Sequence, residues 1–337
     1  MKAIGFTQSL PITDEQSLFA FTTEQPKPEA RDLLVKVEAV SINPVDTKVR
    51  KKAASQDQLD KPRILGFDAV GTVVSVGDQV TLFKEGDTVF YAGDISRSGS
   101  NAEYQLVDER IVGHKPNQLS AAEAAVLPLT ALTAWEALFD RLVMKPGEGA
   151  GKTLLIIGGA GGVGSIAIQL AKQVGKFNVI ATASRPETSQ WVTELGADQV
   201  ANHHSLVESV RALGIEYVDY IFNTADTYGH WDAMVELIKP QGAIVGIVES
   251  GQPVDLSQLQ FKSVAFHWEV MFTRSLYKTD DMIQQHYILE QIKSLVDQGI
   301  IRSTLTETLT GLNAETLKIA HQKSESGKMV GKLAVVY

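Results

Sequence analysis

The first 125 residues alternate between short apolar stretches and turns that contain glycine, a pattern typical of a β-rich domain. Strands are expected at 2–7, 33–42, 69–76, 88–92 and 102–107. Ser120 and Glu123 have the spacing of a capping box, so a helix should begin there, followed by a second at 130–139.

From Thr153 the pattern changes to apolar strands that alternate with amphipathic helices. Strands are expected at 154–157, 178–183, 199–202, 218–223, 243–248 and 263–269, and helices at 165–174, 187–195, 206–213, 231–238 and 279–298. Such a βαβ series predicts a parallel, doubly wound sheet. Strands at 304–308 and 330–335, around a helix at 314–322, are expected to rejoin the first sheet.

The chain is therefore predicted to be an α/β protein of two domains. A β-rich domain is expected at 1–125 and 300–337, and a dinucleotide-binding domain at 126–299.

A glycine loop joins the apolar strand 154–157 to the helix that follows it. Gly159, Gly161 and Gly164 fit the G-x-G-x-x-G fingerprint of dinucleotide-binding proteins, with Gly162 and Val163 between them. In that fingerprint the glycines permit a tight turn, close approach of a pyrophosphate, and close packing of helix on strand. The free N–H groups at the helix N-terminus then face the phosphates. The alternative is a tight turn in a nucleotide-free fold.

The 337 residues carry a formal net charge of −9, which disfavours a nucleic-acid partner. No apolar run of transmembrane length and no signal-peptide pattern is visible, so a cytoplasmic protein without a membrane partner is expected. The absence of cysteine excludes disulfides, a cysteine nucleophile and thiolate metal sites.

The residues about twenty positions beyond the glycines indicate which dinucleotide binds. NAD enzymes usually carry an acidic residue there, whereas this chain has Ser184 and Arg185. Arg185 is suited to pair with a 2′-phosphate, which favours NADPH. Ser184 and Glu187 also fit a capping box, and both interpretations remain open.

Several segments together resemble the medium-chain dehydrogenase/reductase superfamily, most closely its zinc-free quinone oxidoreductase and zinc-type alcohol dehydrogenase-like branch. The segments are the glycine loop, 40–46, 65–77, 86–90, 127–136 and 326–332. The resemblance implies a GroES-like first domain, a Rossmann second domain, and hydride transfer from a nicotinamide.

The chain departs from the zinc members of this superfamily at their metal site. They carry Cys at the position of Asn43 and His-Glu at the positions of Phe67 and Asp68, so no metal site is expected. Without zinc as the Lewis acid that stabilises an alkoxide, a quinone or an α,β-unsaturated carbonyl becomes the favoured hydride acceptor.

The resemblance also implies further cofactor-binding residues: Thr133 near the nicotinamide, His203 near the ribose phosphate, and Lys332 in a segment that reaches back to the cofactor. Asn223 and Gly246 end strands of the predicted sheet, where ligands gather. A metal at the pair His203-His204 is disfavoured, because neighbours on a strand point to opposite faces.

Three residues are candidates for a catalytic role on the acceptor side. Asn43 and Asp46 follow an apolar strand, and the Asn43 amide is suited to bind a ribose or a substrate oxygen; both are also good turn formers. His267 and Glu269 lie two apart on a predicted strand and share a face, so His267 is either a tuned proton donor or part of a subunit contact. Members of this branch commonly dimerise along that strand, so a homodimer is expected.

The sequence thus predicts an NADPH-dependent, zinc-independent oxidoreductase that acts on a small quinone, enal or enone. Two alternatives remain: an alcohol or aldehyde dehydrogenase that recruits a metal, and a weakly catalytic NADPH-binding sensor or structural protein.

Overall fold

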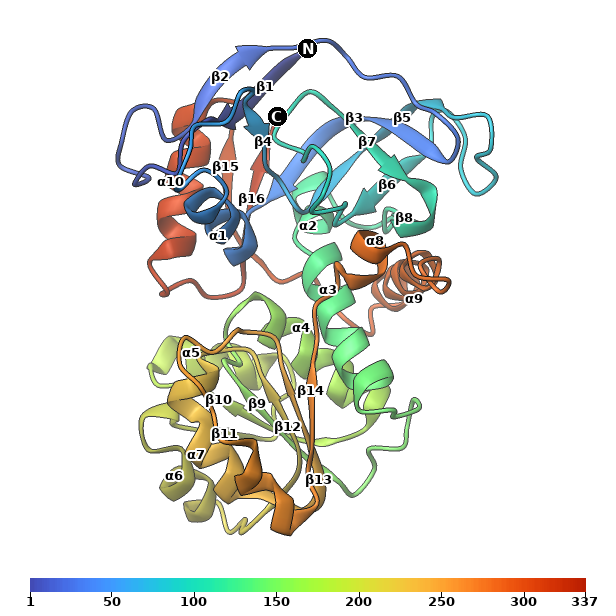
Figure 1. The fold of residues 1–337 in the computed structure, drawn as a ribbon. Coiled ribbons are helices and arrows are strands. Elements are labelled where there is room, and N and C mark those ends of the chain that lie inside the picture. Colours follow the sequence, from blue (N-terminus) through green and yellow to red (C-terminus); the bar gives the residue numbers. More distant parts are fainter. The chain divides into compact units, whose positions relative to one another are not determined.

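The computed structural model describes residues 1–337, which form two compact units (Figure 1). One unit contains residues 1–129 and 272–337, and the other contains residues 130–271. The expected boundary near residue 300 thus differs from the observed one, because residues 272–299 group with the first unit.

The second unit is built on a six-stranded parallel sheet with the strand order β11-β10-β9-β12-β13-β14. The strands are β9 (Thr153–Ile157), β10 (Asn178–Thr182), β11 (Gln199–Ala201), β12 (Val218–Asn223), β13 (Ile238–Gly246) and β14 (Ala265–Trp268). The helices between them are α4 (Gly162–Leu170), α5 (Pro186–Glu194), α6 (Leu206–Ala212) and α7 (Thr227–Leu237). This is the doubly wound order expected for a dinucleotide-binding sheet, and the predicted parallel sheet is confirmed.

The first unit contains a seven-stranded sheet and a three-stranded one. The larger sheet has the order β15-β16-β3-β5-β6-β8, with β7 paired to β3, and the smaller has the order β2-β1-β4. Their strands are β1 (Lys2–Phe6), β2 (Phe19–Thr22), β3 (Asp32–Ser41), β4 (Arg63–Ile64), β5 (Ala69–Val76), β6 (Thr88–Tyr91), β7 (Tyr104–Asp108), β8 (Val112–His114), β15 (Leu305–Thr310) and β16 (Lys332–Val336). Because β16 pairs with β3, the last strands rejoin the first sheet as predicted.

The helices of the first unit are α1 (Pro44–Lys52), α2 (Ala121–Ala125), α8 (Thr273–Tyr277), α9 (Gln284–Asp297) and α10 (Ala314–Glu325). The short α3 (Pro128–Trp135) begins at the boundary and continues into a π-helical turn, Glu136–Arg141. The capping box of Ser120 and Glu123 is confirmed, with the Ser120 N–H donating to Glu123 at 2.9 Å.

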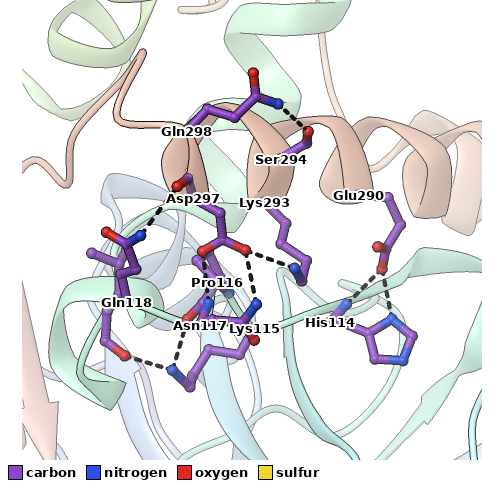
Figure 2. A network of polar contacts seen from close by, with 11 residues as sticks. His114, Lys115, Pro116, Asn117, Gln118, Glu290, Lys293, Ser294, Asp297 and Gln298 are labelled. Atoms are coloured by element: carbon purple, nitrogen blue, oxygen red, sulfur yellow. Dashed lines mark hydrogen bonds and ion pairs between the residues drawn. The ribbon is translucent and has the colours of Figure 1, made fainter.

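Polar contacts explain why α9 belongs to the first unit (Figure 2). Glu290 accepts from the backbone N–H of His114 at 2.7 Å and lies 2.9 Å from its ring nitrogen Nδ1. Asp297 accepts from the backbone N–H of Asn117 at 2.8 Å and from Lys293 at 2.7 Å. An amphipathic pattern predicts such a helix but does not indicate which sheet it covers.

The helical stretch 121–141 is long and apolar enough by composition to cross a membrane. However, 78% of its most apolar window is buried inside the structure, as in the core helix of a globular fold.

Candidate functional site

The glycine loop between β9 and α4 has the geometry that the fingerprint requires. A Cβ on Gly164 would lie 2.3 Å from the carbonyl oxygen of Gly158, and a Cβ on Gly159 would lie 2.9 Å from the Cβ of Ala181. Neighbouring protein atoms therefore leave no room for a side chain at Gly159 or Gly164. A Cβ on Gly161 would meet only the Gly158 oxygen, at an ordinary 3.5 Å, so the protein itself leaves this position open.

The N-terminus of α4 is open to an anion. Gly161 is its N-cap, no side chain caps it, and Gly162 and Val163 remain partly exposed while the rest of the helix is buried. Free backbone N–H groups and the helix dipole favour a phosphate at such a position. The residues present therefore fit a dinucleotide pyrophosphate.

The segment after β10 carries Arg185 as the N-cap of α5. The expected capping box from Ser184 to Glu187 is wrong: the helix begins one residue later, and Arg185 N–H donates to Thr188 Oγ1 at 3.1 Å. The Arg185 side chain pairs with Glu187 at 3.0 Å, with both side chains well exposed. Since exposed ion pairs contribute little, this pair would oppose an interaction of the guanidinium with a phosphate only weakly.

His203 and His204 lie in a short 3₁₀ helix, His203–Ser205, rather than on a strand. The expectation that they point to opposite faces is wrong, because their ring centroids are 4.1 Å apart. The His230 ring lies 6.4 Å from that of His203. Partial burial, and next the neighbouring imidazoles, lower the pKa of His203.

The other predicted cofactor residues of this unit lie where the sequence placed them. Asn223 ends β12, is buried, and donates to Thr227 Oγ1 at 3.1 Å. Gly246 ends β13, where a Cβ would lie 3.2 Å from the Phe266 ring. Thr133 is a buried residue of α3. Their contact with a cofactor remains a prediction.

In the first unit, Asn43 is the N-cap of α1 and is 1% exposed. Its amide donates to the Phe67 carbonyl at 2.7 Å and to Asp68 Oδ2 at 2.8 Å. Its oxygen accepts from the Lys332 ammonium at 2.6 Å. Both amide protons are thus engaged within the protein, which leaves none for the expected bond to a ribose or substrate oxygen.

Asp46 is fully buried and fastens the start of α1 to the Gly66 turn. Its carboxylate accepts from Asn43 N–H at 2.9 Å and from Gly66 N–H at 3.0 Å. Gly66 has φ of +117°, and a Cβ there would lie 2.3 Å from Ser100 Oγ, so only glycine fits. Burial raises the pKa of Asp46 to about 7 despite these hydrogen bonds. The structure thus gives Asp46 a positioning role.

Asp68 and Lys332 complete a buried cluster with Asn43 and Asp46. Asp68 accepts from the backbone N–H of Leu129 at 2.7 Å, and its other oxygen lies 3.4 Å from the Lys332 ammonium. Burial raises the pKa of Asp68 to about 6 and lowers that of Lys332. The ammonium has protein acceptors, so the expected reach of Lys332 to the cofactor remains only a prediction.

His267 and Glu269 do not form the expected pair with each other. Glu269 follows the last residue of β14, is 1% exposed, and accepts from Arg141 Nε at 2.7 Å. Burial, and next the adjacent Glu136, raise the pKa of Glu269 to about 8. His267 is partly exposed on β14, the edge strand of the sheet.

Three members of the buried polar clusters were not predicted from the sequence: Asp68, Glu136 and Arg141. The surroundings of Lys332 also differ from those expected. The sequence does contain a signal for the burial of two charged residues, Asp68 and Lys332. Asp68 immediately precedes the apolar strand β5, and Lys332 opens the apolar strand β16. A charged residue beside such a run is buried only when it has a partner.

Comparisons with known proteins agree with this architecture. The model of the alcohol dehydrogenase GroES-like domain matches residues 29–132, and that of the zinc-binding dehydrogenases matches residues 162–285. A zinc-type alcohol dehydrogenase-like protein of Staphylococcus aureus is 47% identical over 338 residues, 99% of both chains. An NADPH-dependent alkenal/one oxidoreductase of Arabidopsis thaliana is 38% identical over 236 residues, 67% of this chain and 58% of its own.

A crystal structure from Rhizobium etli, provisionally assigned as a zinc-dependent alcohol dehydrogenase, is 48% identical and superimposes with a TM-score of 0.94. The match covers 100% of this chain and 98% of the other.

The zinc that these names imply does not fit the residues at 43 and 67. The Asn43 amide donates both its protons to protein oxygen atoms, and the Phe67 side chain is a buried ring that cannot bind a metal. The Lys332 ammonium lies beside Asn43 and Asp68. Zinc instead requires thiolate, imidazole or carboxylate ligands. No group of three or more His, Cys, Asp or Glu residues is arranged to hold a metal ion.

Proposed function

Because the chain belongs to the medium-chain dehydrogenase/reductase superfamily, we propose that it is an NADPH-dependent, zinc-independent oxidoreductase that transfers a hydride to a quinone or an α,β-unsaturated carbonyl compound. One observation supports the proposal: a glycine loop and a helix N-terminus that suit a dinucleotide occur in a chain whose residues at the family's metal position do not fit a metal.

The glycine loop and Arg185 support the choice of NADPH. The open position at Gly161 and the uncapped start of α4 suit a pyrophosphate. No carboxylate ends β10, and Arg185 stands at the start of α5, where a 2′-phosphate would find a guanidinium. Bound reduced nicotinamide would supply the hydride.

The choice of acceptor follows from what the chain lacks. Alcohol oxidation or simple carbonyl reduction places the charge on a single oxygen, which a Lewis acid stabilises in metal-dependent dehydrogenases. A quinone or an enone instead spreads the developing charge over a conjugated system. Asn43 has no free amide proton, so protonation of the product is assigned to water. The Arabidopsis relative is an alkenal/one oxidoreductase by name, which agrees with this choice.

We expect the protein to act in the cytoplasm as a homodimer. The edge strand β14 supports the dimer, because its backbone is unpaired on one side and Trp268 on it is 49% exposed. A second strand can add to such an edge.

A second candidate is an NADPH-binding sensor or structural protein with little catalysis. The observation in its favour is that both amide protons of Asn43 are donated within the protein, so Asn43 has no amide proton left for a substrate.

Turnover measurements separate the candidates. The chelator-treated protein is incubated with NADPH or NADH and with phenanthrenequinone, a short enal, a primary alcohol or an aldehyde, and the cofactor absorbance is followed. We expect NADPH loss with the quinone or the enal. NADPH binding without turnover of any acceptor would favour the sensor, and activity restored by added zinc would contradict the proposal.

A further inference from the structure

Lys332 is the most deeply buried lysine side chain of the candidate site, at 3% exposure. Its ammonium donates to the Ile42 carbonyl at 3.0 Å and to Asn43 Oδ1 at 2.6 Å, and lies 3.4 Å from Asp68 Oδ2. These acceptors come from the end of β3, the N-cap of α1 and the residue before β5. One side chain on the last strand thus joins two segments from the first third of the chain, Ile42-Asn43 and Asp68.

The ammonium also offsets negative charge in the cluster. Asp46 and Asp68 are both fully buried, and Lys332 is the cation that acts on each of them. Tyr337 is the other titratable group close to Asp46, and its buried hydroxyl donates to the Ser100 carbonyl at 3.1 Å. Without the ammonium, two buried carboxyl groups would have no cation beside them, which is strongly unfavourable.

We propose that the Lys332 ammonium is a built-in cation, which holds Asn43 and Asp68 in place as a metal ion would and excludes a metal from this position. The side chain suits that role because an ammonium is a compact point charge with three donors, matching three oxygen atoms around it. The disagreement between the family's zinc and this chain's residues then has a physical reason: a lysine supplies the positive charge.

The first test is a double-mutant cycle in thermal unfolding. Lys332→Met keeps most of the side-chain volume but removes the charge, and should lower the unfolding temperature by roughly 6–20 °C, as for a broken buried ion pair. The same change should cost clearly less in an Asp68→Asn background. An equal cost in both backgrounds would show that Lys332 acts only by packing and would overturn the proposal.

The second test measures metal binding in Lys332→Ala, which leaves space beside two carboxylates and an amide oxygen. Such oxygen ligands suit Mg²⁺ or Mn²⁺. We expect Mn²⁺ to raise the unfolding temperature of this variant, with stoichiometric binding by EPR. It should not do so for the wild type or for Lys36→Ala, a matched change at an exposed lysine of β3. A Lys332→Ala protein that binds no Mn²⁺ would contradict the equivalence of ammonium and metal.

Lys332→Met alone is not guaranteed to fold. In that case the double variant with Asp68→Asn decides. A folded double variant supports the charge role, and an unfolded one beside a folded Asp68→Asn protein contradicts it.

Discussion

The buried carboxyl group of Glu269 should make the second unit less stable as pH rises. Its neighbours are Arg141, which donates to it at 2.7 Å, and the carboxyl group of Glu136. Burial and the like charge raise its pKa in the folded protein from the ordinary 4.5 to about 8. The folded state therefore holds a proton that the unfolded chain releases above pH 4.5.

The sign and size of the effect follow from this difference. The contribution of Glu269 is fully present below pH 4.5, is lost as pH rises to 8, and changes no further above that. Over this range the free energy of unfolding should fall by up to roughly 5 kcal/mol. Glu269→Gln mimics the protonated acid, so it should abolish this decline and be more stable than the wild type at pH 8.5.

The assay is urea unfolding followed by tryptophan fluorescence between pH 4.5 and 8.5. All four tryptophans lie within residues 130–271, so the signal reports the second unit. Glu208→Gln, a change at an exposed glutamate of α6, serves as the control and should keep the wild-type slope. The reasoning is refuted if Glu269→Gln loses stability with pH as steeply as the wild type, or is the less stable protein at pH 8.5.

Four further substitutions test the cofactor site and the edge strand. Gly161→Val should fold normally, because no protein atom needs the space beside Gly161, but it should lose NADPH and NADH binding in fluorescence titrations. Gly164→Val should fail to fold, because its side chain would collide with the backbone. Normal cofactor affinity in Gly161→Val would contradict the assignment. Arg185→Ala should weaken NADPH binding by about 10–100-fold and leave NADH unchanged in calorimetry, as expected for one lost charge-assisted bond; equal effects on both cofactors would remove Arg185 from the phosphate site. His267→Ala should weaken self-association in sedimentation without slowing turnover, and an inactive, still dimeric variant would instead make His267 a proton donor.

Most of the fold could be predicted from the sequence because its elements have strong local patterns. The strand at 69–76 was predicted with the bounds that β5 has, and the six βαβ strands appear in the doubly wound order. The wrong predictions arose where neighbouring residues compete for the same local structural role. Ser184 and Arg185 are both followed three residues later by a partner for a cap, and only the structure shows that Thr188 is used. Likewise, His203 and His204 lie in a 3₁₀ turn after β11, so the rule that neighbours on a strand point to opposite faces does not apply to them.

The candidate site was less predictable because its residues are distant in sequence. Asn43 and Asp46 could be found as polar residues after an apolar strand, and the glycine loop by its spacing. That Lys332 lies beside Asp68, 264 residues away, depends on β16 pairing with β3 and cannot be read from either local sequence. The same holds for Glu269 and Arg141, which meet only once β14 has added to the sheet.

Deuterium transfer tests the central claim most directly. NADPH labelled with deuterium at the 4-pro-R or 4-pro-S position is incubated with the chelator-treated protein and a short enal, and the product is examined by mass spectrometry. The account predicts that one of the two labels, and not the other, appears on the β-carbon of the product, at a rate that added zinc does not change. A product that carries deuterium from neither label, or transfer that occurs only after zinc is added, would contradict it.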